Sequence, residues 1–153
     1  MFSFLRLSEA TALALHTIGV LAANPEKLIS NQEISERLQV SGNHLAKVHG
    51  RLVRAGIVTG SRGPSGGFRL AAPANEIPLM KIVEAIEGPI HTCQCLLGRT
   101  KCNSADCVMG ALTDSVNGLV IDYLSRTTAD KLATMSPGYK PIQITTGLSS
   151  DTH

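Results

Sequence analysis

Four cysteines, the only ones in the chain, lie within fifteen residues as Cys93, Cys95, Cys102 and Cys107. Their spacing is Cys-x-Cys-x6-Cys-x4-Cys. Thiolates bind metal ions and react with oxidants, and in a reducing compartment clustered cysteines are more often metal ligands or redox sensors than structural disulfides. The segment is therefore a candidate metal or redox centre, and His91 beside it is a further candidate ligand.

Three kinds of chemistry fit this segment. Structural zinc sites usually pair their cysteines as two CxxC knuckles, and neither is present. Irregular spacing along a loop suits an iron–sulfur cluster better, because thiolates on a flexible loop can enclose a larger cofactor. A thiol switch without metal is the remaining alternative, and the spacing alone leaves all three open.

The charges are unevenly distributed along the chain. There are 14 basic and 12 acidic residues, but the stretch from Ser41 to Arg69 has five basic residues and no acidic one. A basic segment inside a slightly acidic remainder is typical of a nucleic-acid-binding surface. Aromatic residues make up only 3% of the chain, so the base stacking of single-strand and RNA readers is poorly supported. Duplex DNA is favoured.

The basic stretch begins in a predicted helix-turn-helix. Ser30 stands three residues before Glu33, which is typical of a capping box at the start of a short helix. After a tight break at residues 40–42, a second helix is expected over about 43–55. Two short helices joined in this way, the second basic on its exposed side, match a DNA-binding helix-turn-helix, with an ordinary αα-hairpin as the alternative. The second helix is expected to bury Leu45, Val48 and Leu52.

A glycine-rich segment then predicts a β-hairpin wing. Gly56 fits the end of the second helix, and strand signals at residues 57–59 and 68–70 flank the glycine-rich residues 60–67. Glycines let the backbone approach a duplex closely, and the guanidinium of Arg62 fits a narrow minor groove. The alternative is a turn whose glycines only supply positive φ, with Arg62 solvated.

We expect the DNA contacts to come from the break, the second helix and the wing. The residues at the start of that helix would meet base edges, whereas Arg51 and Arg54 are placed to hold phosphates. His49 is expected to be a surface polar residue. The predicted DNA-binding set is Ser41, Asn43, His44, Lys47, Arg51, Arg54, Ser61, Arg62, Gly63 and Pro64.

Three more helices complete a fold that is expected to be mainly α with a small β-hairpin wing. They run from about Ser8 to Ala23, onward from Pro78, and from about Val108 to Ser125. The last has an apolar stripe too wide for a lone exposed helix, and a second subunit is its natural cover. The expected regions are a winged helix-turn-helix domain at 1–88, a cysteine-rich loop at 89–107, a dimerisation helix at 108–132 and a disordered tail at 133–153.

These motifs together resemble a known family. The string Leu5-Arg6-Leu7-Ser8, the helix-turn-helix, the wing from Arg62 to Ala71 and the last three cysteines look like the IscR/NsrR/CymR-type regulators of the Rrf-two superfamily. The resemblance covers about residues 5–130. It implies a dimeric bacterial repressor or activator with a long C-terminal dimerisation helix. In many members a [2Fe-2S] or [4Fe-4S] cluster is bound, and its state or loss alters DNA binding.

The chain departs from the family pattern at the fourth cluster ligand. One version of the family uses a histidine three residues after the last cysteine, where this chain has Gly110. Another uses an acidic residue of the first helix, where this chain has Ala12. The resemblance implies Cys95, Cys102 and Cys107 as ligands. The fourth familiar ligand is missing, so we expect Cys93 or His91 of this chain to complete the set.

The predicted function is a cytoplasmic, homodimeric transcriptional regulator that binds double-stranded DNA. It would sense redox state, nitric oxide or iron–sulfur status through the cluster, with an apo form possible. Some relatives read cytosine with an acidic residue at the position of Ala46, so this chain is expected to prefer another operator or to discriminate bases less directly. The alternative is a cluster-free thiol switch or a partner-dependent regulator.

Other classes of protein are disfavoured. A thiol oxidoreductase is not expected, because no CxxC opens a helix and no Ser/His/Asp or paired-carboxylate arrangement is evident. The chain has no apolar run of membrane-spanning length, and residues 1–7 lack the features of a signal peptide. We therefore expect neither an enzyme nor a membrane protein.

Overall fold

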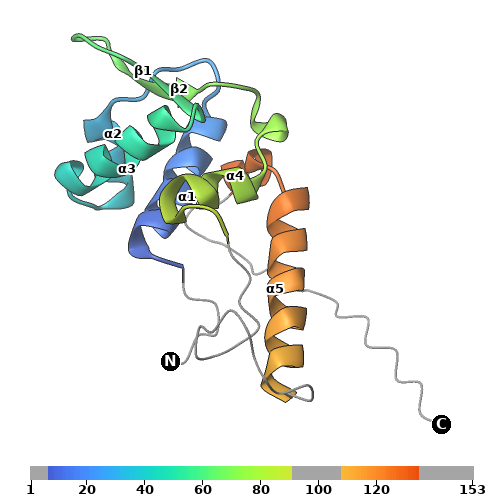
Figure 1. Cartoon of the computed structure of the whole chain (residues 1–153). Helices are drawn as coiled ribbons and strands as arrows, with labels where there is room; N and C mark the ends of the chain where they lie inside the picture. The colour runs from blue at the N-terminus through green and yellow to red at the C-terminus, as the bar shows by residue number, and fades with distance from the viewer. Residues whose placement is uncertain (1–6, 91–107, 135–153) are drawn as a thin grey trace.

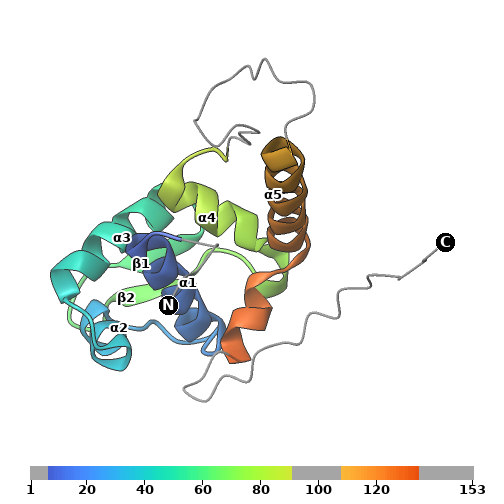
Figure 2. The same ribbon diagram turned by 90° about the horizontal axis from the view of Figure 1, so that it is seen from below.

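The structure, a computed structural model, describes residues 7–90 and 108–134. Helices α2 and α3 and the wing lie on one side of the molecule, and α5 lies on the other (Figures 1 and 2). The mainly helical fold with one antiparallel hairpin confirms the predicted fold class. The elements are α1 (Glu9–Ala22), α2 (Asn31–Leu38), α3 (Gly42–Arg54), β1 (Val58–Ser61), β2 (Gly67–Leu70), η1 (Ala74–Glu76), α4 (Leu79–Glu87), α5 (Val108–Arg126) and η2 (Ala129–Thr134).

Both helices of the helix-turn-helix begin at a capping serine, Ser30 as predicted and Ser41 within the expected break. The Ser30 hydroxyl accepts from the backbone N–H of Glu33 at 3.1 Å, and the Ser41 hydroxyl accepts from that of His44 at 3.5 Å. Gln39, at the end of α2, adopts the left-handed conformation with φ of 55° and turns the chain toward α3. Local capping therefore sets the start of the helix that carries half of the predicted DNA contacts.

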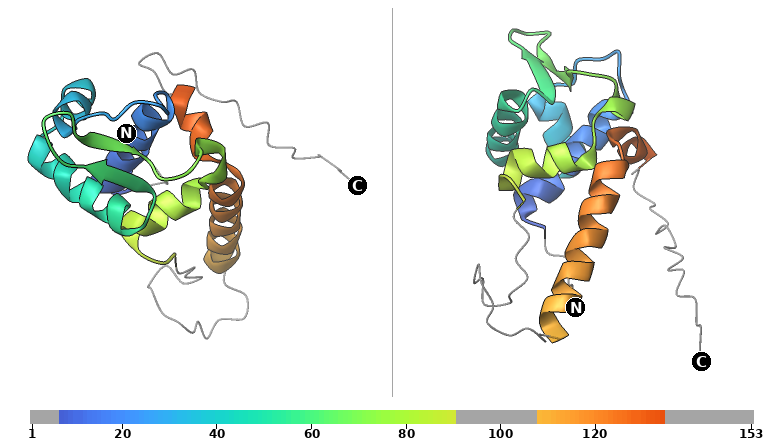
Figure 3. Two further views of the ribbon diagram at one scale, coloured as in Figure 1. Left: turned by 90° about the horizontal axis from the view of Figure 1, so that it is seen from above. Right: turned by 45° about the vertical axis from the view of Figure 1, so that its right-hand side comes forward.

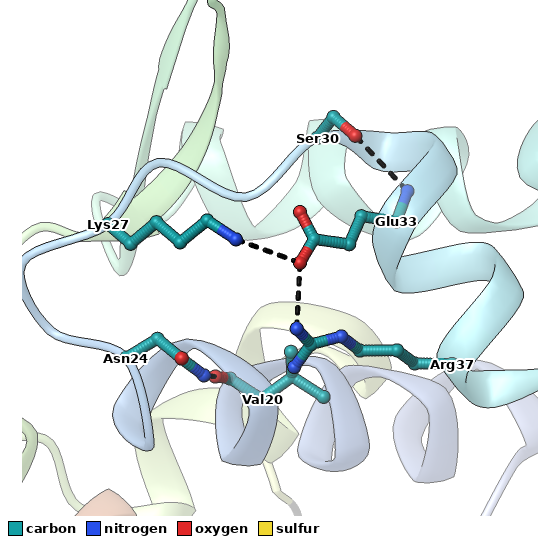
Figure 4. A network of polar contacts seen from close by, with 6 residues as sticks. All are labelled: Val20, Asn24, Lys27, Ser30, Glu33 and Arg37. Carbon is teal, nitrogen blue, oxygen red and sulfur yellow. Dashed lines mark hydrogen bonds and ion pairs between the residues drawn. The ribbon is translucent and has the colours of Figure 1, made fainter.

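The predicted capping box at α2 is only half formed. The Glu33 carboxylate does not reach back toward Ser30 but accepts from Lys27 at 3.1 Å and from Arg37 at 2.7 Å (Figure 4). The hydrogen bond from Lys27 is the main reason why the pKa of Glu33 lies below its ordinary value. These contacts attach the loop before α2 to the helix itself. They are exposed, so we expect them to add little to stability.

The core forms where the apolar stripes of the helices meet. The stripe of α4 has the spacing i, i+3, i+4 and i+7, which places its four residues on one side of the helix, and all four are buried. Gly88, with φ of 86°, ends α4. The buried residues of the α4 stripe are Leu79, Ile82, Val83 and Ile86.

The wing is attached to the helical core by a third extended segment. In the hairpin, Val58 pairs with Leu70 and Ser61 with Gly67. Ile29, just before α2, donates to the Phe68 carbonyl at 3.0 Å and accepts from its N–H at 2.8 Å. A Cβ at position 67 would lie 2.7 Å from the carbonyl carbon and oxygen of Ile29, so only glycine allows this approach. The sequence predicts the hairpin but not this attachment.

The chain returns to the winged-helix core after α5. The helix ends at Arg126, close to the predicted end, and residues 127–134 do not continue it as the expected helix region to 132 implied. The Ala129 N–H donates to the Ile77 carbonyl at 2.8 Å, and Leu132 is buried against α1. A Cβ on Gly19 of α1 would lie 2.8 Å from the Leu132 carbonyl oxygen. The C-terminal end of α5 is thus anchored, and the other proposed region boundaries stay predictions.

Among the described helices, none combines the length and the apolar character needed to cross a membrane.

Candidate nucleic-acid interface

The exposed side of α3 combines cations with small residues. Lys47 and Arg54 are exposed, and Ala46 and Gly50 lie on the same side of the helix. A Cβ at Gly50 would meet no atom within 4 Å, so the space above the backbone is open there. Another macromolecule can therefore approach the α3 backbone closely between the cations.

Several predicted contact residues of α3 already have partners within the protein. Arg51 Nη1 donates to the carbonyl of Ile86 at 3.0 Å. His44 Nδ1 lies 3.8 Å from a carboxylate oxygen of Glu9 on α1. The Ser41 hydroxyl caps α3. Ser41 and Arg51, which were predicted as DNA contacts, therefore also stabilise the protein: Ser41 caps α3, and Arg51 bonds to the end of α4.

The tip of the wing is exposed and tightly turned. Ser61 ends β1, and Arg62, Gly63 and Pro64 form the exposed turn after it, where Gly63 has φ of 114°. The N–H of Gly66 donates to the Gly63 carbonyl at 2.9 Å and closes the turn. The hairpin reaches out on the same side of the molecule as α3 (Figure 3). The wing tip and the exposed side of α3 are therefore available to one partner.

The prediction that His49 is a surface residue is wrong. The side chain is 1% exposed, and its ring centroid lies 4.2 Å from that of Phe68 in the wing. Neither ring nitrogen has a hydrogen-bond partner among the described residues. Burial lowers the pKa of His49 to about 4. Position 49 follows Leu45 by four residues and precedes Leu52 by three, so helical spacing was the signal for burial.

The predicted metal centre lies outside the described residues, since His91, Cys93, Cys95, Cys102 and Cys107 all fall between 90 and 108. Within residues 7–90 and 108–134, no three His, Cys, Asp or Glu side chains gather in a way that could hold a metal ion.

The capped helix pair, the cationic α3 and the attached hairpin define a winged helix-turn-helix protein. The family model Rrf2, described as an iron-dependent transcriptional regulator, matches residues 7–135, and the chain belongs to this family. It is 39% identical over 83 residues to the HTH-type regulator BadM of Rhodopseudomonas palustris, about half of each chain (54% and 53%). It is 33% identical over 129 residues to the HTH-type regulator NMA1593 of Neisseria meningitidis, covering 84% of this chain and 87% of the relative.

Solved structures have the same fold. CymR of B. subtilis, described as the global cysteine regulator, gives a TM-score of 0.75 at 24% identity and covers 87% of this chain and 99% of its own. The oxidized form of CymR from Staphylococcus aureus gives a TM-score of 0.70 at 26% identity, and the match covers 86% of this chain and 98% of that chain. IscR of T. potens gives a TM-score of 0.68 at 24% identity, and the match covers 89% of this chain and 96% of that chain. The resemblance to the IscR and CymR type of regulator is confirmed.

Proposed function

We propose that this transcriptional regulator binds duplex DNA with α3 in a major groove and the wing in the adjoining minor groove. One observation carries the proposal: all five cations between positions 41 and 69 are exposed, on a stretch without any acidic residue. Cations that neutralise phosphates supply most sequence-independent affinity for DNA. These cations are Lys47, Arg51, Arg54, Arg62 and Arg69. Arg51 already donates to the Ile86 carbonyl, so the other four are the proposed phosphate contacts.

The wing contact is tested by Arg62→Ala. We expect weaker binding to duplex DNA, and a fall of about one in the slope of log affinity against log salt if the guanidinium holds a phosphate. Fluorescence anisotropy at several salt concentrations measures both. Arg126→Ala is the matched control, because Arg126 is paired with Asp122 at 2.7 Å on α5, away from the wing. Unchanged affinity and slope in Arg62→Ala would exclude Arg62 from the contact surface.

We further propose that a second copy of the chain covers the exposed apolar side of α5. Five large apolar side chains there are between 44% and 61% exposed. They alternate at spacings of three and four residues, which is the heptad pattern of a helix that packs against another helix. A symmetric pair would present two copies of α3 to two half-sites. The five residues, called the α5 seam below, are Met109, Leu112, Val116, Leu119 and Tyr123.

The cysteine segment is proposed as the sensor. Four thiols within fifteen residues form a donor set of the kind that iron–sulfur clusters require. The family description as iron-dependent and the fold of IscR support this choice. Cys95, Cys102 and Cys107 would hold the cluster, and Cys93 or His91 would complete it. When bound, such a cluster supplies a centre that reacts with oxidants and nitric oxide.

The remaining role of the chain is to connect the sensor to the DNA-binding surface. In sequence, the segment 91–107 stands directly between residue Ile90, which follows α4, and α5. Helix α4 packs against α1, α3 and α5. A change in the segment would therefore bias the placement of the two α3 helices, and with it the half-site spacing.

The ligand assignment predicts different outcomes for two neighbouring cysteines. Alternate residues rarely both bind one cluster without strain, so Cys93→Ala and Cys95→Ala should differ in iron and sulfide content after anaerobic purification. The variant with the smaller content identifies the ligand. Full retention in both variants would contradict the proposal that either thiol is needed, and total loss in both would show that Cys93 completes the ligand set beside Cys95.

A metal-free thiol switch is the second candidate. It is favoured by the likeness to the oxidized form of CymR and by the two positions that depart from the family's ligand pattern. One of them, Ala12, is exposed on α1 and offers no ligand atom. In this case oxidation would join cysteines within 91–107, and DNA binding would respond to oxidant and thiol reductant without iron.

A further inference from the structure

Three helices meet at one polar junction beneath the DNA-binding surface. The hydroxyls of Ser8 and Thr11, at the start of α1, both donate to the Glu87 carboxylate at the end of α4. From α3, Arg51 Nη1 donates to the carbonyl of Ile86 at 3.0 Å. The hydrogen bond from Ser8, followed by that from Thr11, lowers the pKa of Glu87, and the charge of Arg51 adds to the effect. The ionised form of Glu87 is thus favoured.

The end of α4 requires an outside donor at this point. The last carbonyls of a helix have no partner within the helix. Gly88 turns the chain away from the helix with φ of 86°, and Pro89, next in the chain, has no N–H to offer. The carbonyl of Ile86 therefore accepts from Arg51, and a cation near a helix C-terminus is electrostatically favourable.

The junction supplies a directional contact that the apolar packing of α3 lacks. Leu45, Val48 and Leu52 fix which side of α3 faces the core, but apolar contact is non-directional and tolerates small shifts along the helix axis. A hydrogen bond from Arg51 to a fixed carbonyl restricts such shifts. Thr11 of α1 holds the same end of α4 through the Glu87 carboxylate.

We infer that Arg51 and Thr11 are positioning residues for DNA recognition, and that Arg51 acts through α4 instead of holding a phosphate. The inference rests on the proposed DNA-binding function. It replaces the expectation from the sequence that Arg51 is a phosphate contact. Thr11 is fully buried, so any effect of this residue on DNA recognition must pass through the protein.

The test compares two duplexes, one selected from a random pool by the wild-type protein and one with its sequence scrambled. Arg51→Gln is expected to weaken binding to the selected duplex about tenfold more than to the scrambled one, with the salt slope unchanged. Arg54→Gln, the control on the same helix, should weaken both duplexes alike and lower the slope by about one. Thr11→Val keeps the shape of the side chain but removes its hydroxyl. It should also lower the ratio of the affinity for the selected duplex to the affinity for the scrambled duplex.

Each outcome separates the alternatives. A slope lowered by about one in Arg51→Gln, with both duplexes weakened alike, identifies a phosphate contact and overturns the inference for Arg51. An unchanged preference in a folded Thr11→Val variant overturns the positioning role of the junction, and this variant decides the matter if Arg51→Gln unfolds. If the wild-type protein enriches no duplex from the random pool, the proposed function itself is refuted.

Discussion

Leu119→Asp is expected to convert the proposed dimer into a monomer and to weaken binding to the selected duplex by about a hundredfold or more, because the two half-sites are no longer bound together. Leu119 is 61% exposed in the single chain and lies within the α5 seam. In the proposed dimer its side chain would be covered by the partner helix. An uncompensated carboxylate buried there would cost several kcal/mol.

Sedimentation velocity measures the change in mass, and anisotropy measures the change in affinity. The control is Ser125→Asp, which places the same charge at an exposed position about 120° around the helix from Leu119, away from the seam. It should leave the dimer and the affinity intact. A Leu119→Asp variant that remains dimeric would show that the α5 seam is not the dimer interface.

Acid is expected to destabilise the protein through His49. Its pKa is about 4 in the folded state against an ordinary value of 6.5, so between these values the unfolded chain binds a proton that the folded protein does not. The stabilising contribution of the neutral ring is complete above about pH 6.5 and declines as the pH falls toward about 4. The full difference corresponds to roughly 3 kcal/mol, and relaxation and water near the charged ring reduce it to about 2 kcal/mol.

The measurement is urea unfolding at several pH values in this range, at one protein concentration. His49→Leu removes two buried nitrogens that have no partner among the described residues, so it should be neutral or stabilising near pH 7. The same substitution should also remove most of the decrease in the free energy of unfolding at low pH. His16→Ala, at an exposed position of α1, serves as the control and should lose stability as the wild type does. If the free energy of unfolding depends on pH in the same way in His49→Leu and in the wild type, His49 is not the group that destabilises the protein in acid.

Local patterns predicted the helices because each depends on near neighbours in the chain. Ser30 and Ser41 cap the helices that follow them, and the α4 stripe is buried as its spacing indicates. The hairpin was predicted from its glycines, although β1 extends to Ser61, beyond the expected strand of residues 57–59. The predicted winged fold was correct for the same reason.

Contacts between distant segments were not predicted from the sequence. Nothing near Ile29 marks it as the strand that pairs with Phe68, and nothing after Arg126 indicates the return to α1. The junction at Glu87 likewise depends on where three helices meet. Arg51 could therefore be recognised as a basic residue on α3, but its partner Ile86 only appears in the folded chain.

The central claim is that the cysteine segment makes DNA binding depend on an iron–sulfur cluster. The most direct measurement is anaerobic purification with iron and sulfide analysis, an absorption spectrum, and titration of the selected duplex before and after exposure to air. The account predicts iron and sulfide near equimolar per subunit, visible absorption that air alters, and a change in DNA affinity with it. Protein that stays colourless after reconstitution, with the same affinity in air and without it, would contradict the claim.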